Sequence, residues 1–256
     1  MSDFFAKVDP YLYDLSLPYV VPGVRQAQAL RSSFFRDSFD TTMPLFGLDV
    51  GVGTGSDLKN LMADYDDFSV FGIDQSSNLT KGLIDPDKDN HTSKRQVHYI
   101  EGDFTQWDAF AKVQSLCHIG LDFVSSSFAI HNVPEDLQQR CFEYIARMLK
   151  PKAPFFYLDL VGYDCETLQS HADNADLLFI EQQMRETPNG ASEREWQRLA
   201  ERWNQHYQTE NFITPLNSFR GPSVTEMFAA AGLSQPEVIY RHYNTTLLYA
   251  TRLELP

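Results

Sequence analysis

Short apolar runs alternate with amphipathic stretches along most of this chain. The runs are brief, rich in Val, Ile, Leu and Phe, and bounded by polar residues or glycine, which is typical of strands. Seven runs are predicted to form strands: Leu45–Val50, Phe68–Ile73, Val97–Ile100, Leu121–Ser125, Phe155–Val161, Val238–Tyr240 and Thr245–Thr251. Several lack polar alternation, which indicates parallel strands covered by helices on both faces. The pattern predicts an α/β fold.

Apolar residues at helical spacing fill the intervals between these strands. Helices are predicted over Val24–Phe35, from Ser56 or Thr54 through Met62, over Pro134–Leu149 and over Val224–Ala231. Ser223 and Glu226 form a predicted capping box for the last of these helices. A long insert follows the fifth strand and is predicted to contain two further helices, the second capped by Ser192 and Glu195.

A cluster of glycines separates the first strand from the helix after it. Gly51, Gly53 and Gly55 alternate directly after Asp49 and Val50. A residue without Cβ can adopt positive φ and lets the backbone pass close to a ligand. A strand, a glycine turn and a helix N-terminus together predict a ligand site at the carboxyl edge of a parallel sheet.

The next strands also end in polar or aromatic side chains. Asp74 follows the second strand, Asp103 and Phe104 follow the third, and Ser127 and His131 follow the fourth. The carboxyl ends of parallel strands meet at one edge, so these side chains are expected together. An acidic residue after the second strand is placed to reach ribose hydroxyls, which indicates a nucleoside-containing ligand.

The acidic residue followed by alternate glycines resembles the first motif of class I S-adenosylmethionine-dependent methyltransferases, and the resemblance extends over roughly residues 40 to 256. A nicotinamide fingerprint would place its last glycine two positions later than Gly55. The resemblance implies a Rossmann-like fold with a seven-stranded, mostly parallel sheet and an antiparallel last strand. It also implies S-adenosylmethionine as cofactor and S-adenosylhomocysteine as product.

By this resemblance, each strand end receives part of the cofactor. Asp49 and the glycine turn would surround the methionine portion, Asp74 would bind the ribose, and Ser127 would lie on the sulfonium side. Gln75, Asp103 and Phe104 would flank the adenine. The cofactor-binding residues predicted in this way are Asp49, Gly51, Val52, Gly53, Gly55, Asp74, Gln75, Asp103, Phe104 and Ser127.

We expect one domain over residues 1–256. Its expected parts are an N-terminal helical lid (1–40), a cofactor-binding core (41–163), a helical cover (164–215), and the last helix with the closing strands (216–256). The lid is rich in aromatic residues, which either cover the site or pack onto the sheet; Tyr19 is its substrate-binding candidate. In the cover, Trp196 and Trp203 are predicted to form an apolar roof or, alternatively, a homodimer contact.

Because a sulfonium methyl group is already electrophilic, such an enzyme mainly has to orient the acceptor and exclude water. His131 is the candidate general base, since an imidazole suits proton transfer near neutrality; alternatively it caps a turn. His206, Tyr207 and His242 are weaker candidates. Asp159 is suited to supporting a base or a metal, but no further ligands can be named, so no metal is predicted.

Composition restricts the partners. A net charge of −14 disfavours nucleic acid, which needs a basic surface, and favours a small-molecule acceptor. The sequence leaves open whether the fold brings together a local basic patch from Arg25, Arg31, Arg36, Arg220 and Arg241. No apolar run is long enough to span a bilayer and no signal peptide is recognisable, so a cytoplasmic location without membrane association is expected. The three cysteines, Cys117, Cys141 and Cys165, are expected to be small buried side chains.

The predicted function is methyl transfer from S-adenosylmethionine to an O, N or C atom of a small molecule. One alternative is an enzyme similar to carboxy-S-adenosylmethionine synthases, which act on the cofactor itself; Arg220 would then bind a carboxylate. Another is a non-catalytic protein that binds the cofactor.

Overall fold

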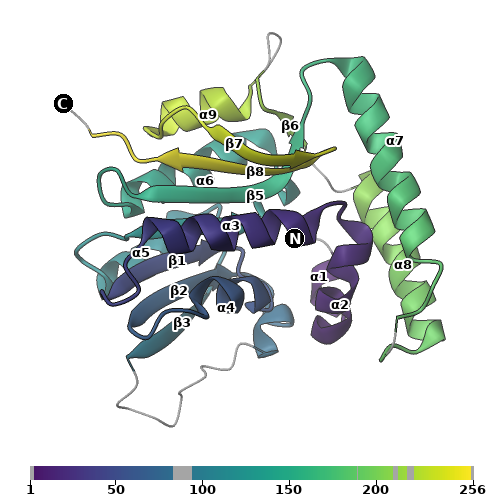
Figure 1. The fold of residues 1–256 in the computed structure, drawn as a ribbon, viewed down its shortest axis with the longest axis horizontal. Coiled ribbons are helices and arrows are strands. Elements are labelled where there is room, and N and C mark those ends of the chain that lie inside the picture. Colours follow the sequence, from purple (N-terminus) through teal and green to yellow (C-terminus); the bar gives the residue numbers. More distant parts are fainter. Residues whose placement is uncertain (1–2, 83–93, 189, 210–212, 218–221, 255–256) are drawn as a thin grey trace.

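The computed structural model describes residues 3–82, 94–188, 190–209, 213–217 and 222–254, which form one twisted sheet between helices (Figure 1). The strand order is β3-β2-β1-β4-β5-β8-β7, with β8 antiparallel to both of its neighbours. The strands are β1 Leu45–Val50, β2 Phe68–Asp74, β3 Arg95–Glu101, β4 Phe123–Ser127, β5 Pro154–Gly162, β6 Thr214–Pro215, β7 Glu237–His242 and β8 Thr245–Thr251.

This arrangement confirms the predicted α/β fold with a mostly parallel sheet and one antiparallel strand near its edge. The seven predicted strands form the continuous path, and β6 adds a short parallel pairing with β5 within the described residues. The fourth strand begins later than predicted, because Leu121 forms only an isolated bridge with Leu149. The centre of the sheet is apolar on both faces, as continuous apolar runs require: Val70 and Phe71, which are consecutive in β2 and point to opposite faces, are both buried.

Helices cover both faces of the sheet (Figure 1). One face is covered by α3 and α4, and the other by α5, α6 and α9. The α-helices are α1 Asp3–Lys7, α2 Pro10–Val20, α3 Val24–Ser38, α4 Ser56–Met62, α5 Trp107–Leu116, α6 Glu135–Met148, α7 Glu166–Gln183, α8 Glu193–Thr209 and α9 Val224–Ala231. Two 3₁₀ helices are η1 Leu79–Gly82 and η2 Ile130–Asn132. The predicted capping box at Ser223 and Glu226 is present.

The lid helices α1 and α2 and the cover helices α7 and α8 pack together beside the end of the sheet (Figure 1). Trp196 and Trp203 are buried in their shared apolar core. The indole of Trp196 donates to the Met184 carbonyl at 3.2 Å, and that of Trp203 donates to Ser16 Oγ at 2.9 Å. The alternative of a homodimer contact through these two rings is therefore wrong, because the same chain already covers them.

Two other points of the sequence analysis come out differently in the structure. The basic patch that the sequence left open lacks two of its members: Arg31 is buried, and Arg241 stacks on Tyr163 while donating to backbone carbonyls of β5. Arg220 lies outside the described residues. Cys165 is exposed, in contrast to Cys117 and Cys141, which are buried as expected. Within the described ranges, none of the helices has the length and apolar character needed to cross a membrane.

Candidate functional site

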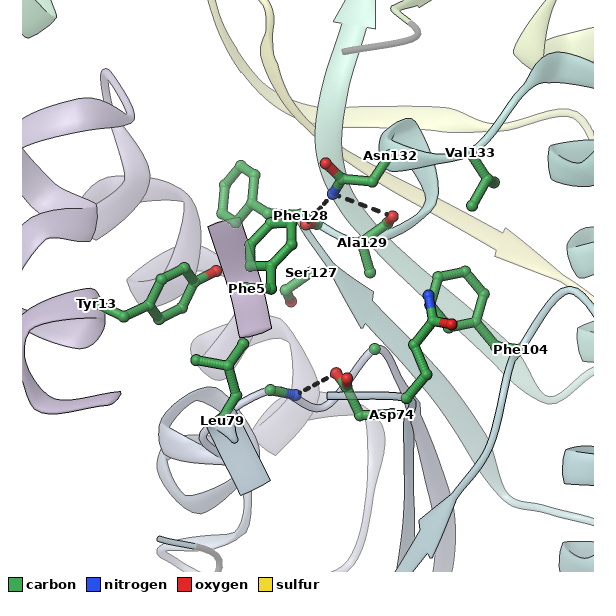
Figure 2. Close-up of a pocket in the computed structure, with 13 residues that line it drawn as sticks. Phe5, Tyr13, Asp74, Leu79, Phe104, Ser127, Phe128, Ala129, Asn132 and Val133 are labelled. Carbon is green, nitrogen blue, oxygen red and sulfur yellow. Dashed lines mark hydrogen bonds between the residues drawn. The ribbon is translucent and has the colours of Figure 1, made fainter. Parts of the chain in front are cut away.

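Three neighbouring cavities lie at the carboxyl edge of the sheet, between the strand ends and the lid. The first cavity has about 630 Å³ of space free of protein atoms, including the open solvent at its mouth. Figure 2 shows Tyr13, Phe5 and Phe128 on its lid side, with Phe104 and Val133 opposite. Of the residues predicted to bind the cofactor, six line this cavity: Gly51, Gly53, Asp74, Gln75, Phe104 and Ser127.

The glycine turn adopts the backbone conformation expected from its sequence. Gly51, Gly53 and Gly55 all have positive φ, at 75°, 53° and 72°. A Cβ on Gly51 would stand 2.2 Å from the Ala129 Cβ, which is a clash. A Cβ on Gly53 would find Leu79 at 3.9 Å as its nearest neighbour, so it would occupy open space beside the cavity. The first glycine is therefore needed for packing and the second keeps the cavity free.

Asp74 joins this turn to the end of β2. Its Oδ2 accepts a hydrogen bond from the Gly53 amide at 2.9 Å (Figure 2), and its Oδ1 accepts one from the Ser76 amide at 2.7 Å. Burial raises the pKa of Asp74, whereas the amide hydrogen bonds lower it. The carboxylate is thus fixed at the cavity wall with lone pairs left for ligand hydroxyls.

Another buried carboxylate lies in the third cavity, on the other side of the glycine turn. Asp49 is 3% exposed, and its Oδ1 has no hydrogen-bond partner among the described residues. Burial, with a smaller contribution from Asp57, raises its pKa well above the usual range, and Arg31 opposes the shift. An ammonium group bound here would pair with the unsatisfied oxygen, so the residues present fit the charged end of a methionine.

Arg31 is a site residue that the sequence prediction did not identify. It extends from α3 beneath the strand ends, where its guanidinium donates to Ser127 Oγ and, at 3.3 Å, to Ser125 Oγ, and pairs with Asp57. Its side chain is 0% exposed. The sequence feature that indicates the burial of Arg31 is its spacing of four residues from both Ala27 and Phe35, which lie on the buried face of the same helix.

The second cavity adjoins the first and extends between the lid and the cover. Its free space is about 490 Å³, and most of its wall is apolar or aromatic. Tyr13 and Phe128 border all three cavities. Phe128 has a positive φ of 51°, an uncommon backbone conformation for an aromatic residue. Tyr19 packs edge-on against Trp196, at 5.3 Å between ring centres, and the ring that reaches the cavities from α2 is Tyr13.

His131 lines the second cavity and is held by a buried carboxylate. Its Nδ1 forms a hydrogen bond with Asp159 Oδ1. Asp159 Oδ2 accepts hydrogen bonds from the backbone amides of Ile130 and His131, at 3.1 and 3.3 Å. Asp159 is 0% exposed. Hydrogen bonding to a carboxylate at Nδ1 places the proton there, which leaves Nε2 as the basic nitrogen. Of the weaker candidates, His206 and Tyr207 also line this cavity, whereas His242 packs edge-on against Tyr243.

Three predicted cofactor-binding residues, Val52, Gly55 and Asp103, have different positions relative to the cavities. Val52 lines the third cavity, and Gly55 is the N-cap of α4. Asp103 follows β3 as predicted, but its Oδ1 accepts both the backbone amide and the hydroxyl of Thr105, at 2.8 and 2.7 Å. Its neighbour Phe104 supplies the side chain that lines the first cavity.

The lid is also attached to the glycine turn directly. Asp14 of α2 accepts hydrogen bonds from Thr54 Oγ1, at 2.6 Å, and from Ser56 Oγ. Asp14, Thr54 and Ser56 all line the third cavity. The position of α2 over the site is therefore coupled to the turn that would hold the cofactor.

Comparisons with known proteins agree with this geometry. Residues 48–152 match the family described as "Methyltransferase domain". No curated protein sequence matches the chain. Among solved structures, magnesium protoporphyrin IX methyltransferase from Synechocystis, determined with bound S-adenosylhomocysteine, is similar with a TM-score of 0.61 and 11% identity over 98% of this chain and 97% of that one.

Two further structures show the same fold. An O-methyltransferase family protein from Burkholderia thailandensis is similar with a TM-score of 0.60 and 12% identity, over 98% of this chain and 62% of that one. Phosphoethanolamine N-methyltransferase 2 from Haemonchus contortus, solved with S-adenosyl-L-methionine, has a TM-score of 0.55 and 14% identity over 98% of this chain and 60% of that one. The chain thus spans about three fifths of the length of these two proteins.

The strand order and the matched domain define a Rossmann-like methyltransferase fold. Residues 48–152 carry the match to the methyltransferase domain family, and over the whole chain the similarity to solved methyltransferases is one of fold.

Proposed function

We propose that this protein binds S-adenosylmethionine across the first and third cavities and methylates a small molecule held in the second. The observation that carries the proposal is that Tyr13 and Phe128 border all three cavities. A ligand that fills the first and third cavities would meet a ligand in the second at these rings. The net charge of −14 supports a small molecule, rather than nucleic acid, as the acceptor.

The residues at the strand ends suit the parts of this cofactor. Asp74 would accept the ribose hydroxyls, Gln75 and Phe104 would lie against the adenine, and Asp49 would pair with the methionine ammonium group. When bound, S-adenosylmethionine supplies a methyl group on a sulfonium, which is a strong electrophile. The protein has to position the acceptor beside it and keep water out, and the aromatic rings between the cavities suit both tasks.

His131 is the residue we propose to remove a proton from the acceptor. Its Nε2 is the basic nitrogen, and Asp159 orients the ring and stabilises the imidazolium that forms after proton transfer. Such a base is useful for a hydroxyl or a protonated amine, so acceptors of these two kinds are favoured over carbon acceptors. Asp159 acts here through His131, and so it is a positioning residue.

The first test is calorimetric titration of the protein with S-adenosylmethionine and with S-adenosylhomocysteine, comparing wild type with Asp74→Ala. We expect about 10- to 100-fold weaker binding in the variant, because hydrogen bonds to a charged group contribute about 1.5–3 kcal/mol. Asp66→Ala is the matched control, since Asp66 lies before the opposite end of the same strand and is 92% exposed. No binding of either ligand to wild type would contradict the proposal.

Mass spectrometry of any ligand that co-purifies would separate the alternatives. A carboxylated form of the cofactor would favour the synthase-like activity, for which the structure offers no argument because Arg220 lies outside the described residues. Tight cofactor binding without transfer to any acceptor would favour a non-catalytic protein. The cytoplasmic location and a homodimer stay predictions from the sequence.

A further inference from the structure

The second cavity contains an acidic side chain that methyl transfer itself does not require. Asp176 of α7 is 0% exposed and borders this cavity, away from the wall shared with the first. Its Oδ2 accepts hydrogen bonds from the Tyr207 hydroxyl at 2.8 Å and from Asn244 Nδ2 at 2.9 Å. Its Oδ1 is buried without a hydrogen-bond partner in the part of the chain that the structure describes. One half of the carboxylate is thus fixed and the other half is unsatisfied.

A buried carboxylate oxygen without a partner is costly, since it has lost its water and gained nothing in return. No lysine or arginine lines this cavity within the described ranges. The other titratable groups on its wall are His131, His206, Tyr13 and Tyr207. The described wall therefore offers Asp176 no permanently charged cation, and a cationic ligand would supply one.

The walls of the cavity also favour a cation with an apolar body. Tyr13 stacks on Trp203 with 5.7 Å between ring centres, and Phe5 meets His206 edge-on at 5.1 Å. Aromatic faces attract ammonium groups through their negative quadrupole, most strongly where water is excluded. The overall charge of −14 adds a long-range attraction for positively charged small molecules.

We propose that the acceptor is a small apolar amine whose protonated nitrogen binds Asp176 Oδ1 in the second cavity. The inference rests on the proposed function, because it names the kind of molecule that this cavity presents to the cofactor. The ammonium group serves as an anchor, and the atom that receives the methyl group lies at the opposite end of the molecule, near His131 and Asn132. Asn132 Oδ1 is likewise buried without a partner in the described chain, so it suits a hydrogen-bond donor at the reacting end.

The test uses matched pairs of ligands that differ only in their charged end. Tyramine is compared with 2-(4-hydroxyphenyl)ethanol, and phenethylamine with 2-phenylethanol, by titration into the full chain saturated with S-adenosylhomocysteine. We expect each amine to bind about tenfold or more tightly than its alcohol, because a charge-assisted hydrogen bond in a buried site is stronger than a neutral one. Equal affinities within the pairs, or no binding of either amine, would overturn the inference.

Variants locate the preference on Asp176. In Asp176→Asn the preference for amines should disappear, while the affinity for S-adenosylhomocysteine stays the same. Asp173→Asn is the matched control: Asp173 lies one turn earlier on α7 and also accepts from Asn244 at 2.9 Å, but it does not line the cavity. An amine preference that survives in Asp176→Asn would also overturn the inference.

A second variant covers the case in which Asp176→Asn does not fold. Tyr207→Phe removes one donor to Asp176 but keeps the carboxylate, so the amine preference should persist. Its loss in Tyr207→Phe would count against Asp176 as the anchor. Failure of wild type to bind S-adenosylhomocysteine would instead contradict the proposed function, which keeps the two failures apart.

Discussion

The first and third cavities, proposed for the cofactor, and the second cavity, proposed for the acceptor, share Tyr13 and Phe128 but differ in how the rest of their walls are built. The first is formed largely by backbone turns and short side chains at strand ends, such as Gly53 and Asp74, which the parallel sheet holds at one edge. The second is formed mostly by side chains from the lid and the cover, such as Asp176 and Trp203, and partly by the sheet and the segment after β4, which supply Leu160 and His131.

This difference assigns different tasks to the two regions. A sheet edge with a glycine turn can hold the same nucleoside in many proteins, because the groups that bind it belong to the fold. Helices packed beside that edge can change their side chains without altering the sheet, so under the proposed function they would decide which acceptor is bound. We therefore expect substitutions in the cover to change acceptor binding and those at the strand ends to change cofactor binding.

The largest effect on this comparison is expected from His131→Gln. Loss of a general base should lower kcat by about 10²- to 10⁴-fold for a hydroxyl acceptor. The Kd for S-adenosylhomocysteine should not change, because His131 lines the second cavity only. Steady-state kinetics and calorimetry measure the two quantities.

His206→Gln is the control for this variant, since His206 lines the same cavity on the side of the cover. It should raise KM more than it lowers kcat. Equal losses of kcat in the two variants would contradict the assignment of the base to His131.

The next largest effect is expected from Arg31→Met, which removes a buried cation beneath the cofactor cavities. Breaking its pair with Asp57 and its bonds to Ser125 and Ser127 should lower the free energy of unfolding by about 3 kcal/mol. Arg36→Met on the same helix breaks only an exposed pair with Asp64 and should cost less than about 1 kcal/mol. Denaturant unfolding measures both, and similar losses would show that Arg31 is not a structural support.

A smaller effect concerns the pH dependence of stability at Asp176. Burial raises its pKa to about 6, above the value of about 3.9 in an unfolded chain. The folded state therefore binds more protons between these values, and this carboxylate makes the protein less stable as pH rises from about 4 to 6. Asp176→Asn, which cannot titrate, should gain about 2 kcal/mol relative to wild type over that interval.

Denaturant unfolding at a series of pH values gives this difference directly. Asp173→Asn should follow the wild-type curve more closely, because it leaves the Asp176 carboxylate in place. A constant difference between wild type and Asp176→Asn across the interval would show that Asp176 titrates normally.

The smallest effect is expected where the two regions meet, at Asp14. Asp14→Ala removes the hydrogen bonds from Thr54 and Ser56 that hold α2 on the glycine turn. We expect about tenfold weaker binding of S-adenosylmethionine, since one charged hydrogen-bond acceptor is lost at a partly exposed site. Asp9→Asn, at the start of the same helix, keeps its N-cap and should bind normally. Equal affinities in all three proteins would mean that the lid does not contribute to cofactor binding.

Much of the sheet and of the first cavity was predictable from the sequence. Gly51 and Gly53 follow a buried strand directly, and Asp74 ends the next one, so short-range patterns were sufficient to place them together. Arg31 was not predicted to be buried, because an arginine on a helix is normally exposed, and its spacing from Ala27 and Phe35 was the only local signal against that rule. The partners that bury it, Asp57 and Ser127, are distant in sequence.

The strands, the turn and the helix caps follow from local sequence, because each depends on neighbouring residues and on the conformations that they allow. The stacking of Tyr13 on Trp203 and the position of Asp176 in a cavity with His131 follow instead from how the helices pack in the folded chain. These contacts join segments separated by long stretches of chain. Helical spacing predicts which face of a helix is apolar, but it does not predict which element packs against that face. The second cavity is therefore a product of tertiary packing, whereas the glycine turn beside the first cavity depends on local sequence.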